Sequence, residues 1–173
     1  MNIYFAKLDQ PTFEIAEAFS RWENDPNLIP FSRPNMNEDA LGKRQAVTVD
    51  DLAQRLQHNQ IYLIYLDGQL IGEIDYQVDP AHLFKKEMKT AWIGICIGEA
   101  VGRGKGIGYQ ALQYLEEQIR LQGLKRIELG VFVFNTNAIK LYQKLGYVEI
   151  GSIKDFTYWQ GQMWQDIRME KYI

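Results

Sequence analysis

The chain has 173 residues, 46% of them hydrophobic and 24% charged, and this length and apolar content predict one folded domain spanning residues 1–173. Its net charge of −3 argues against a nucleic-acid-binding protein, because binding to a phosphate backbone needs a strongly basic face. One cysteine and two histidines exclude an internal disulfide and give no support for a metal centre, and without a long apolar run or a signal-like N-terminus we expect a cytoplasmic protein that does not enter membranes.

The N-terminal residues predict a strand followed by a helix. Residues 1–8 are rich in Ile, Tyr and Phe, which favours a strand. Apolar residues at three- and four-residue spacing then predict an amphipathic helix at 11–23. Trp22, at the end of that helix, is either a packing aromatic or a contact to a bound molecule.

A long irregular segment follows this helix. Residues 24–46 contain Pro26, Pro30 and Pro34 and show no sustained hydrophobic period, so we expect a loop. Loops of this length inside a compact domain are usually functional or mobile. A capping-box sequence, Thr48-x-x-Asp51, then predicts the start of a short second helix that ends near residue 58.

A β-hairpin is predicted next. Ile61–Leu66 is a continuous apolar run, and Asp67-Gly68 is a type I′ turn signal before a second strand at 69–78. Strand alternation places Leu70, Ile74, Tyr76 and Val78 on one face and Glu73, Asp75 and Gln77 on the other. The polar face either lies in solvent or lines a cleft, where Glu73 or Asp75 would hold a cation or accept a proton.

The stretch from Thr90 to Tyr114 organises the chain. A polar loop at 79–89, expected to carry solvated charge, leads to the apolar strand Ala91–Ile97 and then to a turn with a glycine at every second position from 102 to 108. Glycine permits left-handed φ values and lets a ligand approach peptide N–H groups. Because this turn opens into an amphipathic helix, whose first N–H groups are unpaired and positively polarised, the stretch predicts an anion-binding site.

The glycine spacing separates three phosphate-binding motifs. The P-loop is excluded, because no Gly-Lys-Ser/Thr sequence follows the turn. A dinucleotide fingerprint survives only as a variant starting at Gly106, too far from the strand that should immediately precede it. The pattern R-x-x-G-x-G fits from Arg103 to Gly108, and it resembles the pyrophosphate-binding signature of the GNAT superfamily of acetyl-CoA-dependent N-acetyltransferases. A nucleotide-phosphate-binding protein is kept as an alternative.

A second resemblance to this superfamily lies downstream. A helix closed by Gly123 and a buried strand at 126–134 predict a parallel β-α-β crossover. The sequence NTNAIKLYQKLGYVEIG at 135–151 is similar to the later motif of the superfamily. Residues 147–156 and 163–172 predict a terminal hairpin, and the tail at 151–173 resembles the ribosomal-protein and polyamine acetyltransferases. The resemblance implies an α/β fold in which about four helices flank a mixed sheet of roughly six or seven strands.

The resemblance also implies an acetyl-CoA site and no metal. The strands at 91–97 and 126–134 would splay apart, and the pantetheine arm would bind the backbone of Ile95, Cys96 and Ile97 like an added strand. The pyrophosphate would bind the N–H groups of Arg103, Gly104, Lys105, Gly106, Ile107 and Gly108. Asn135 and Asn137 would contact the cofactor arm, although Asn135 can also cap a helix. Tyr142 would protonate the departing thiolate; its alternative role is packing.

For the acceptor side, the resemblance implies direct transfer of the acetyl group, within a ternary complex, to a primary amine of a small molecule or peptide. Glu73, Asp75 and Glu99 are the candidates for the base that takes the amine proton. Trp22, Glu73 and Asp75 are the candidate acceptor contacts, and the segment 24–46 is expected to form a lid. A non-catalytic acyl-CoA sensor on the same fold is the alternative function, and a homodimer stays open.

Overall fold

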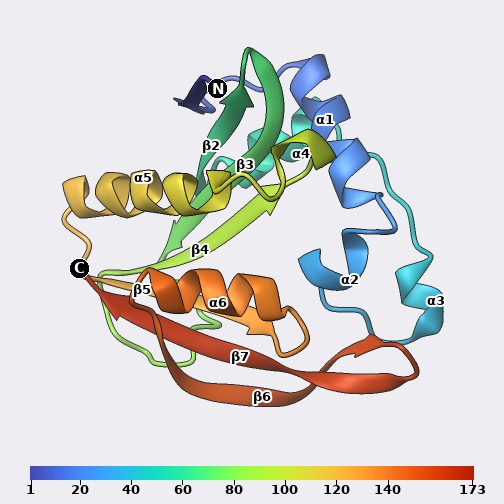
Figure 1. Cartoon of the computed structure of the whole chain (residues 1–173), viewed down its shortest axis with the longest axis vertical. Helices are drawn as coiled ribbons and strands as arrows, with labels where there is room; N and C mark the ends of the chain where they lie inside the picture. Colours follow the sequence, from blue (N-terminus) through green and yellow to red (C-terminus); the bar gives the residue numbers. More distant parts are fainter.

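One mixed β-sheet runs through the molecule. The computed structural model describes residues 1–173, and its seven strands lie in the order β1-β2-β3-β4-β5-β7-β6 (Figure 1). Their bounds are β1 Ile3–Lys7, β2 Asn59–Leu66, β3 Gln69–Val78, β4 Thr90–Ile97, β5 Arg126–Phe132, β6 Val148–Trp159 and β7 Gln162–Tyr172. Only β4 and β5 pair in parallel, and every other neighbouring pair is antiparallel. The predicted mixed sheet with one β-α-β crossover is therefore confirmed.

Helices cover both faces of this sheet. Their bounds are α1 Phe13–Glu23, α2 Ile29–Ser32, α3 Glu38–Leu41, α4 Val49–Arg55, the 3₁₀ turn η1 Ala100–Gly102, α5 Ile107–Leu121 and α6 Thr136–Lys144. On one face, the apolar stripe of α5 packs with α6 in the larger core. The stripe consists of Ile107, Ala111, Leu112, Leu115 and Ile119. On the other face, Trp22 of α1 and Leu52 of α4 pack against Leu63 of β2 in a smaller core. None of the helices is both long enough and apolar enough to cross a membrane.

The segment 24–46 is more regular than the sequence predicted. It contains the two short helices α2 and α3 where only a loop was expected, which raises the number of α-helices from about four to six. Asn37 caps α3 through its side chain, which accepts the N–H of Ala40, a local signal that needs no hydrophobic period. The segment is also tied to β6, because the hydroxyl oxygen of Thr157 accepts the N–H of Asn35 at 2.9 Å.

A bulge in β3 moves Leu70 to the opposite face from the one predicted. The pairing of β2 with β3 shifts register just after Ile64, and Ile71 is the residue without a partner. Ile71 therefore joins Ile74 in the larger core, whereas Leu70 packs in the smaller one. Beyond the bulge the predicted alternation holds, so the carboxylates of β3 project from the face opposite Ile74.

The strands β4 and β5 separate after a short ladder. Their parallel pairing consists of Thr90 with Arg126, Ala91 with Ile127 and Trp92 with Glu128, and it ends there. The splaying implied by the family resemblance is therefore present. Two residues beyond the last pair, Gly94 of β4 and Gly130 of β5 occupy the next facing positions of this register. The backbone of β4 that faces β5 consequently has no strand partner from Ile93 onward.

Candidate active site

A cavity of about 750 Å³ opens where β4 and β5 separate. Its walls come from α1, α2 and the two residues after it, the strands β3, β4, β5, β6 and β7, the 79–89 loop and α6. Seven residues proposed from the sequence line it: Trp22, Glu73, Asp75, Ile95, Cys96, Asn135 and Tyr142. Ile97, Glu99, Asn137 and the turn 103–108 lie outside its lining. The fold thus brings these seven residues together from segments far apart in the chain.

The glycine turn before α5 has the backbone geometry of an anion site. Gly104 and Gly106 have φ values of 71° and 74°, and nothing lies within 4 Å of an added Cβ at either residue. Gly106 is the N-cap of α5 and provides no side-chain cap, so the first N–H groups of the helix are left for a ligand. No side chain of residue 104 or 106 therefore stands between an anion and the positive end of α5.

The two cations of this turn have different roles. The Arg103 guanidinium turns back on the chain, where Nε donates to the carbonyl of Ile97 at 3.1 Å and Nη2 donates to that of Gly98 at 2.7 Å. These bonds fix the end of β4 against the turn. Lys105 is exposed to solvent. Arg103 therefore braces the turn, and Lys105 is the cation available to an incoming anion.

Tyr142 reaches the cavity from α6, on the side of the larger core. Its side chain is 7% exposed, and its ring packs edge-on against Tyr147 with centroids 5.9 Å apart. Burial raises the pKa of Tyr142 to about 12, so the phenol keeps its proton at neutral pH. Asn135 caps α6 by accepting the N–H of Ala138 at 3.4 Å, which was the alternative role foreseen for it, and it also lines the cavity.

Glu73 and Asp75 form a carboxyl pair on the opposite face of the sheet. They stand beside Cys96 and Gly94 of β4 in the β3–β4 pairing. A Cβ at Gly94 would lie 2.7 Å from Oδ2 of Asp75, so the absence of a side chain there allows this carboxyl to lean over β4. Burial raises the pKa of Asp75 to about 6, and burial together with the charge of Asp75 raises the pKa of Glu73 well above its ordinary value. Glu73 is thus the member that keeps a proton and donates it to an ionised Asp75.

Glu99 is held away from the cavity. Its Oε1 accepts from Nη2 of Arg21 at 2.9 Å and from Nε1 of Trp22 at 2.8 Å. The bond from Arg21 lowers the pKa of Glu99, which makes this carboxylate a weaker base than the pair on β3. Trp22 itself is 3% exposed and its ring lies against Gly98, so it packs as well as lining the cavity.

The cavity offers acid–base groups and free backbone rather than a metal or a reactive thiol. No group of three or more His, Cys, Asp or Glu side chains is placed to hold a metal ion. Burial raises the pKa of the Cys96 thiol to about 12, which keeps it protonated and a poor nucleophile.

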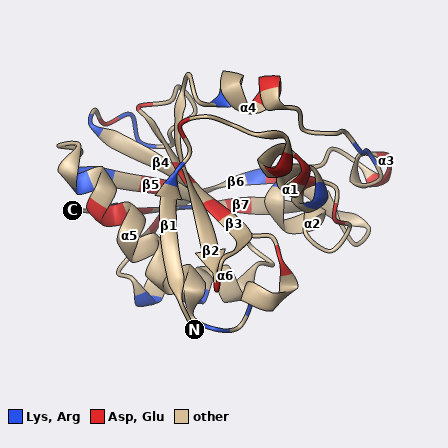
Figure 2. Ribbon diagram, turned by 90° about the horizontal axis from the view of Figure 1, so that it is seen from above, with Lys and Arg blue, Asp and Glu red and all other residues tan.

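The wall formed by β5, β7 and the 79–89 loop was missed in the sequence reading. Its polar members are His82, Asp166 and Arg168, which stand near Trp92 at the base of the split. Figure 2 marks acidic positions on β3 and β7, the strands on either side of the β4–β5 pair. The available signal was the alternation Asp166-x-Arg168-x-Glu170 in β7, which places three charges on one face of the strand.

The chain is similar to known N-acetyltransferases in sequence and in fold. Residues 16–147 match the family model described as the acetyltransferase (GNAT) family. The uncharacterized N-acetyltransferase YdgE of Bacillus subtilis is 41% identical over 81 residues, which are 46% of this chain and 48% of that protein. The spermine/spermidine N(1)-acetyltransferase of Bacillus subtilis is 31% identical over 95 residues, which are 54% of this chain and 62% of that protein.

These curated relatives are matched over about half to three fifths of their length. A solved structure shows the same fold over the whole chain. The acetyltransferase of the GNAT family from Streptococcus pneumoniae superposes with a TM-score of 0.78 over 99% of this chain and 100% of that one, at 21% identity. The overall fold of the chain is therefore one that recurs in a solved GNAT-family structure.

Proposed function

The chain belongs to the acetyltransferase (GNAT) family, and on this premise we propose that it transfers the acetyl group of acetyl-CoA to a primary amine by direct attack in a ternary complex. The main support for this proposal is the placement of Tyr142 and Asp75. Tyr142 reaches the split from the α6 side, and Asp75 leans over Gly94 from the opposite face. A thioester lying between β4 and β5 would therefore have a proton donor on one side and a proton acceptor on the other.

Two features of the chain fit acetyl-CoA. The β4 backbone from Ile93 to Ile97 lacks a partner on its β5 side, so a pantetheine arm can bind there as an extra strand would. The open glycine turn before α5 suits the pyrophosphate, with Lys105 as an added cation. A backbone N–H of this part of β4 would also stabilise the oxyanion, a contribution of about 3 kcal/mol where one such donor is lost.

The proposed proton transfers use the buried pair and the buried tyrosine. Asp75 accepts a proton from the amine as nitrogen bonds to the carbonyl carbon. The carbon–sulfur bond then breaks, and Tyr142 donates its proton to the leaving thiolate. Burial raises the pKa of Tyr142 to about 12, so the phenol still carries its proton when the thiolate leaves.

The acceptor class follows from the cavity and from one relative. The β3 wall carries the Glu73–Asp75 pair, which favours a cationic amine over an anionic or neutral acceptor. The relative named spermine/spermidine N(1)-acetyltransferase acts on amines according to its name. By analogy we propose an amine acceptor for this chain, without choosing a particular polyamine.

A free-thiol release assay tests the function. The protein is incubated with acetyl-CoA and a panel of peptides, polyamines, aminoglycosides and amino acids, and CoA thiol is measured. We expect release that depends on one class of primary amine. Tight binding of acetyl-CoA without release on any member would instead support a sensor of acyl-CoA, the second function compatible with this fold.

The glycine turn supplies a matched pair of variants. Gly106→Ala and Gly161→Ala both place a Cβ at a φ near 80° with nothing within 4 Å, so both should lose similar stability, on the order of 1 kcal/mol. Only Gly106 stands at the proposed pyrophosphate site, and its replacement should raise the KM for acetyl-CoA by roughly tenfold. Equal KM values for the two variants would remove the turn from the cofactor site.

A further inference from the structure

Two facing glycines form a notch at the point where β4 and β5 separate. Gly94 is covered by Asp75 from β3, as described above. Gly130, across the split, is covered in the same way from β7, because a Cβ there would lie 2.6 Å from Oδ2 of Asp166. Both carboxyls line the cavity. The notch is thus flanked by a carboxyl group on each side, one from each outer neighbour of the split pair.

The Asp166 carboxyl is buried and only partly bonded. The residue is 3% exposed, and Oδ2 accepts from Nε of Arg168 at 2.8 Å. Its second oxygen, Oδ1, accepts no hydrogen bond from the protein, although the residue lines the cavity. Burial raises the pKa of Asp166 despite the neighbouring Arg168, which shows that one guanidinium does not fully compensate this carboxylate. Because Asp166 lines the cavity, Oδ1 is open to a hydrogen-bond donor of a molecule bound there.

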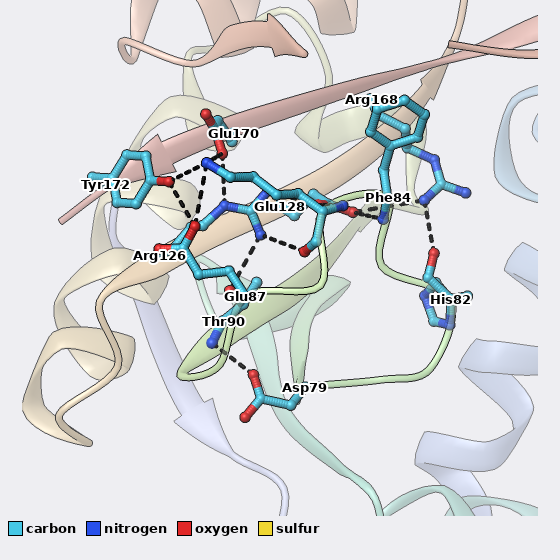
Figure 3. A network of polar contacts seen from close by, with 11 residues as sticks. Asp79, His82, Phe84, Glu87, Thr90, Arg126, Glu128, Arg168, Glu170 and Tyr172 are labelled. Atoms are coloured by element: carbon cyan, nitrogen blue, oxygen red, sulfur yellow. Dashed lines mark hydrogen bonds and ion pairs between the residues drawn. The ribbon is translucent and has the colours of Figure 1, made fainter. Parts of the chain in front are cut away.

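A chain of alternating charges ends at this carboxyl. Figure 3 shows part of it, from Glu87 through Glu170, Arg126 and Glu128 to Arg168. In order, its members are Glu87, Lys85, Glu170, Arg126, Glu128, Arg168 and Asp166, each within 4.0 Å of the next. Four carboxylates thus alternate with three cations, and one negative charge is left over. Glu87 ends the chain in solvent, with its side chain 38% exposed, and Asp166 ends it in the cavity. The next member of the series, on the cavity side, would be a cation.

Arg168 is held in the cavity wall by its own contacts, so it is not the additional cation that would follow Asp166 in the series. Its Nη1 donates to the carbonyl of His82 at 3.1 Å, and its guanidinium lies 4.8 Å from the ring centroid of Trp92. Glu128 holds the same wall in place, because its carboxylate accepts the N–H groups of Phe84 and Lys85 at 2.7 and 3.0 Å. The network therefore fixes Asp166 while leaving one of its oxygens to the cavity.

We propose that Asp166 is a specificity-determining residue that binds a second cationic nitrogen of the acceptor, across the notch from the nitrogen that is acetylated. This inference rests on the proposed function and names its substrate class: a diamine or longer polyamine rather than a monoamine. Adjacent strands lie about 5 Å apart, and β4 and β5 are already diverging at the notch, so the two carboxyls suit nitrogens separated by at least about 5 Å. A chain of three or four methylene groups between the nitrogens has that reach.

The test compares a diamine with a monoamine of equal length. The intact protein is assayed for thiol release from acetyl-CoA with 1,4-diaminobutane and with pentylamine, and again as the Asp166→Asn variant. Asparagine keeps an oxygen for Nε of Arg168 and removes the charge, so the wall should stay in place. We expect the variant to raise the KM for the diamine by tenfold or more and to leave the KM for the monoamine within twofold.

Asp155→Asn is the matched control, because Asp155 is exposed on the adjacent strand β6. It should leave both KM values unchanged. An equal effect of Asp166→Asn on both amines, or no effect on either, overturns the inference. So does an intact protein that prefers the monoamine or treats the two amines alike, a result that needs no variant. Thiol release with any amine in these assays upholds the proposed function even where Asp166 fails, so the two failures can be told apart.

Discussion

Replacement of Tyr142 by phenylalanine is expected to lower kcat by about 10²- to 10³-fold and to leave the KM for acetyl-CoA nearly unchanged. A general acid typically contributes that factor, and its role begins only when the carbon–sulfur bond breaks. The phenyl ring keeps the packing of this buried side chain against Tyr147, so the fold should be retained. Steady-state rates of thiol release measured at saturating amine check the prediction.

Tyr147→Phe serves as the control for this variant. Tyr147 is 2% exposed, belongs to the same core and lies outside the cavity lining, so removal of its hydroxyl should not affect kcat. A second readout uses acetyl thioesters of more acidic thiols, which need less help from an acid. The loss caused by Tyr142→Phe should shrink with such donors. A Tyr142→Phe enzyme that turns over acetyl-CoA at the native rate would exclude Tyr142 as the acid.

The features that the sequence predicted depend on short-range patterns. The α5 stripe repeats with the helical period, and the left-handed glycines 104 and 106 lie within one turn of the chain. The position of Tyr142 came from a local motif shared with the family. In each case the residues that define the feature are close in sequence, so pattern and geometry coincide.

The features that were missed depend on pairing between distant strands. Asp166 reaches the notch because β7 is the strand that pairs with β5. In this pairing Arg168 stands opposite Gly130, and Asp166, two residues earlier, lies on the same face of β7. The bulge at Ile71, which reverses Leu70, is likewise a property of the β2–β3 register. Strand alternation specifies which residues share a face, but it does not specify which strand is the neighbour.

The direction of individual side chains was also not predictable from the sequence. Arg103 fits the family signature, yet its guanidinium donates to the carbonyls of its own strand end. Glu99 was a candidate base until Arg21 and Trp22, 77 or more residues away in the chain, proved to hold its carboxylate. Arg103 lies in the glycine turn and Glu99 just before it, and the side chains of both are turned by partners that no local pattern predicts.

The largest effect on the acceptor side is expected from Asp75→Asn, which should lower kcat/KM by about 10²- to 10³-fold at pH 7 because the amide cannot accept the amine proton. Glu73→Gln is the matched variant. Its amide can replace the protonated carboxyl as a hydrogen-bond donor to Asp75, so it should retain most of the activity. Similar losses in the two variants would argue against Asp75 as the specific base.

The pH dependence distinguishes a base from a residue that only positions the amine. Asp75 must be ionised to act, and its pKa is raised to about 6, chiefly by burial. If the acceptor enters as an ammonium ion, native kcat/KM should rise about tenfold per pH unit below pH 6 and level off between pH 6 and 9, since alkylamines titrate near pH 10. Groups that face the pair from α1, α4 and β4 are Glu23, Arg55 and Cys96, and all three are unchanged in the variant.

Without Asp75, only amine that is already neutral in solution can attack. The break near pH 6 should therefore disappear in Asp75→Asn, and kcat/KM should climb steadily toward the pKa of the amine. A break that persists in the variant would belong to another group, and Asp75 would then only position the amine. Because Glu73 and Asp75 share one proton, the native break is an apparent value of the pair. In Glu73→Gln the break in kcat/KM should therefore shift to another pH but still be present. A purely structural role of Asp75 would not produce this result.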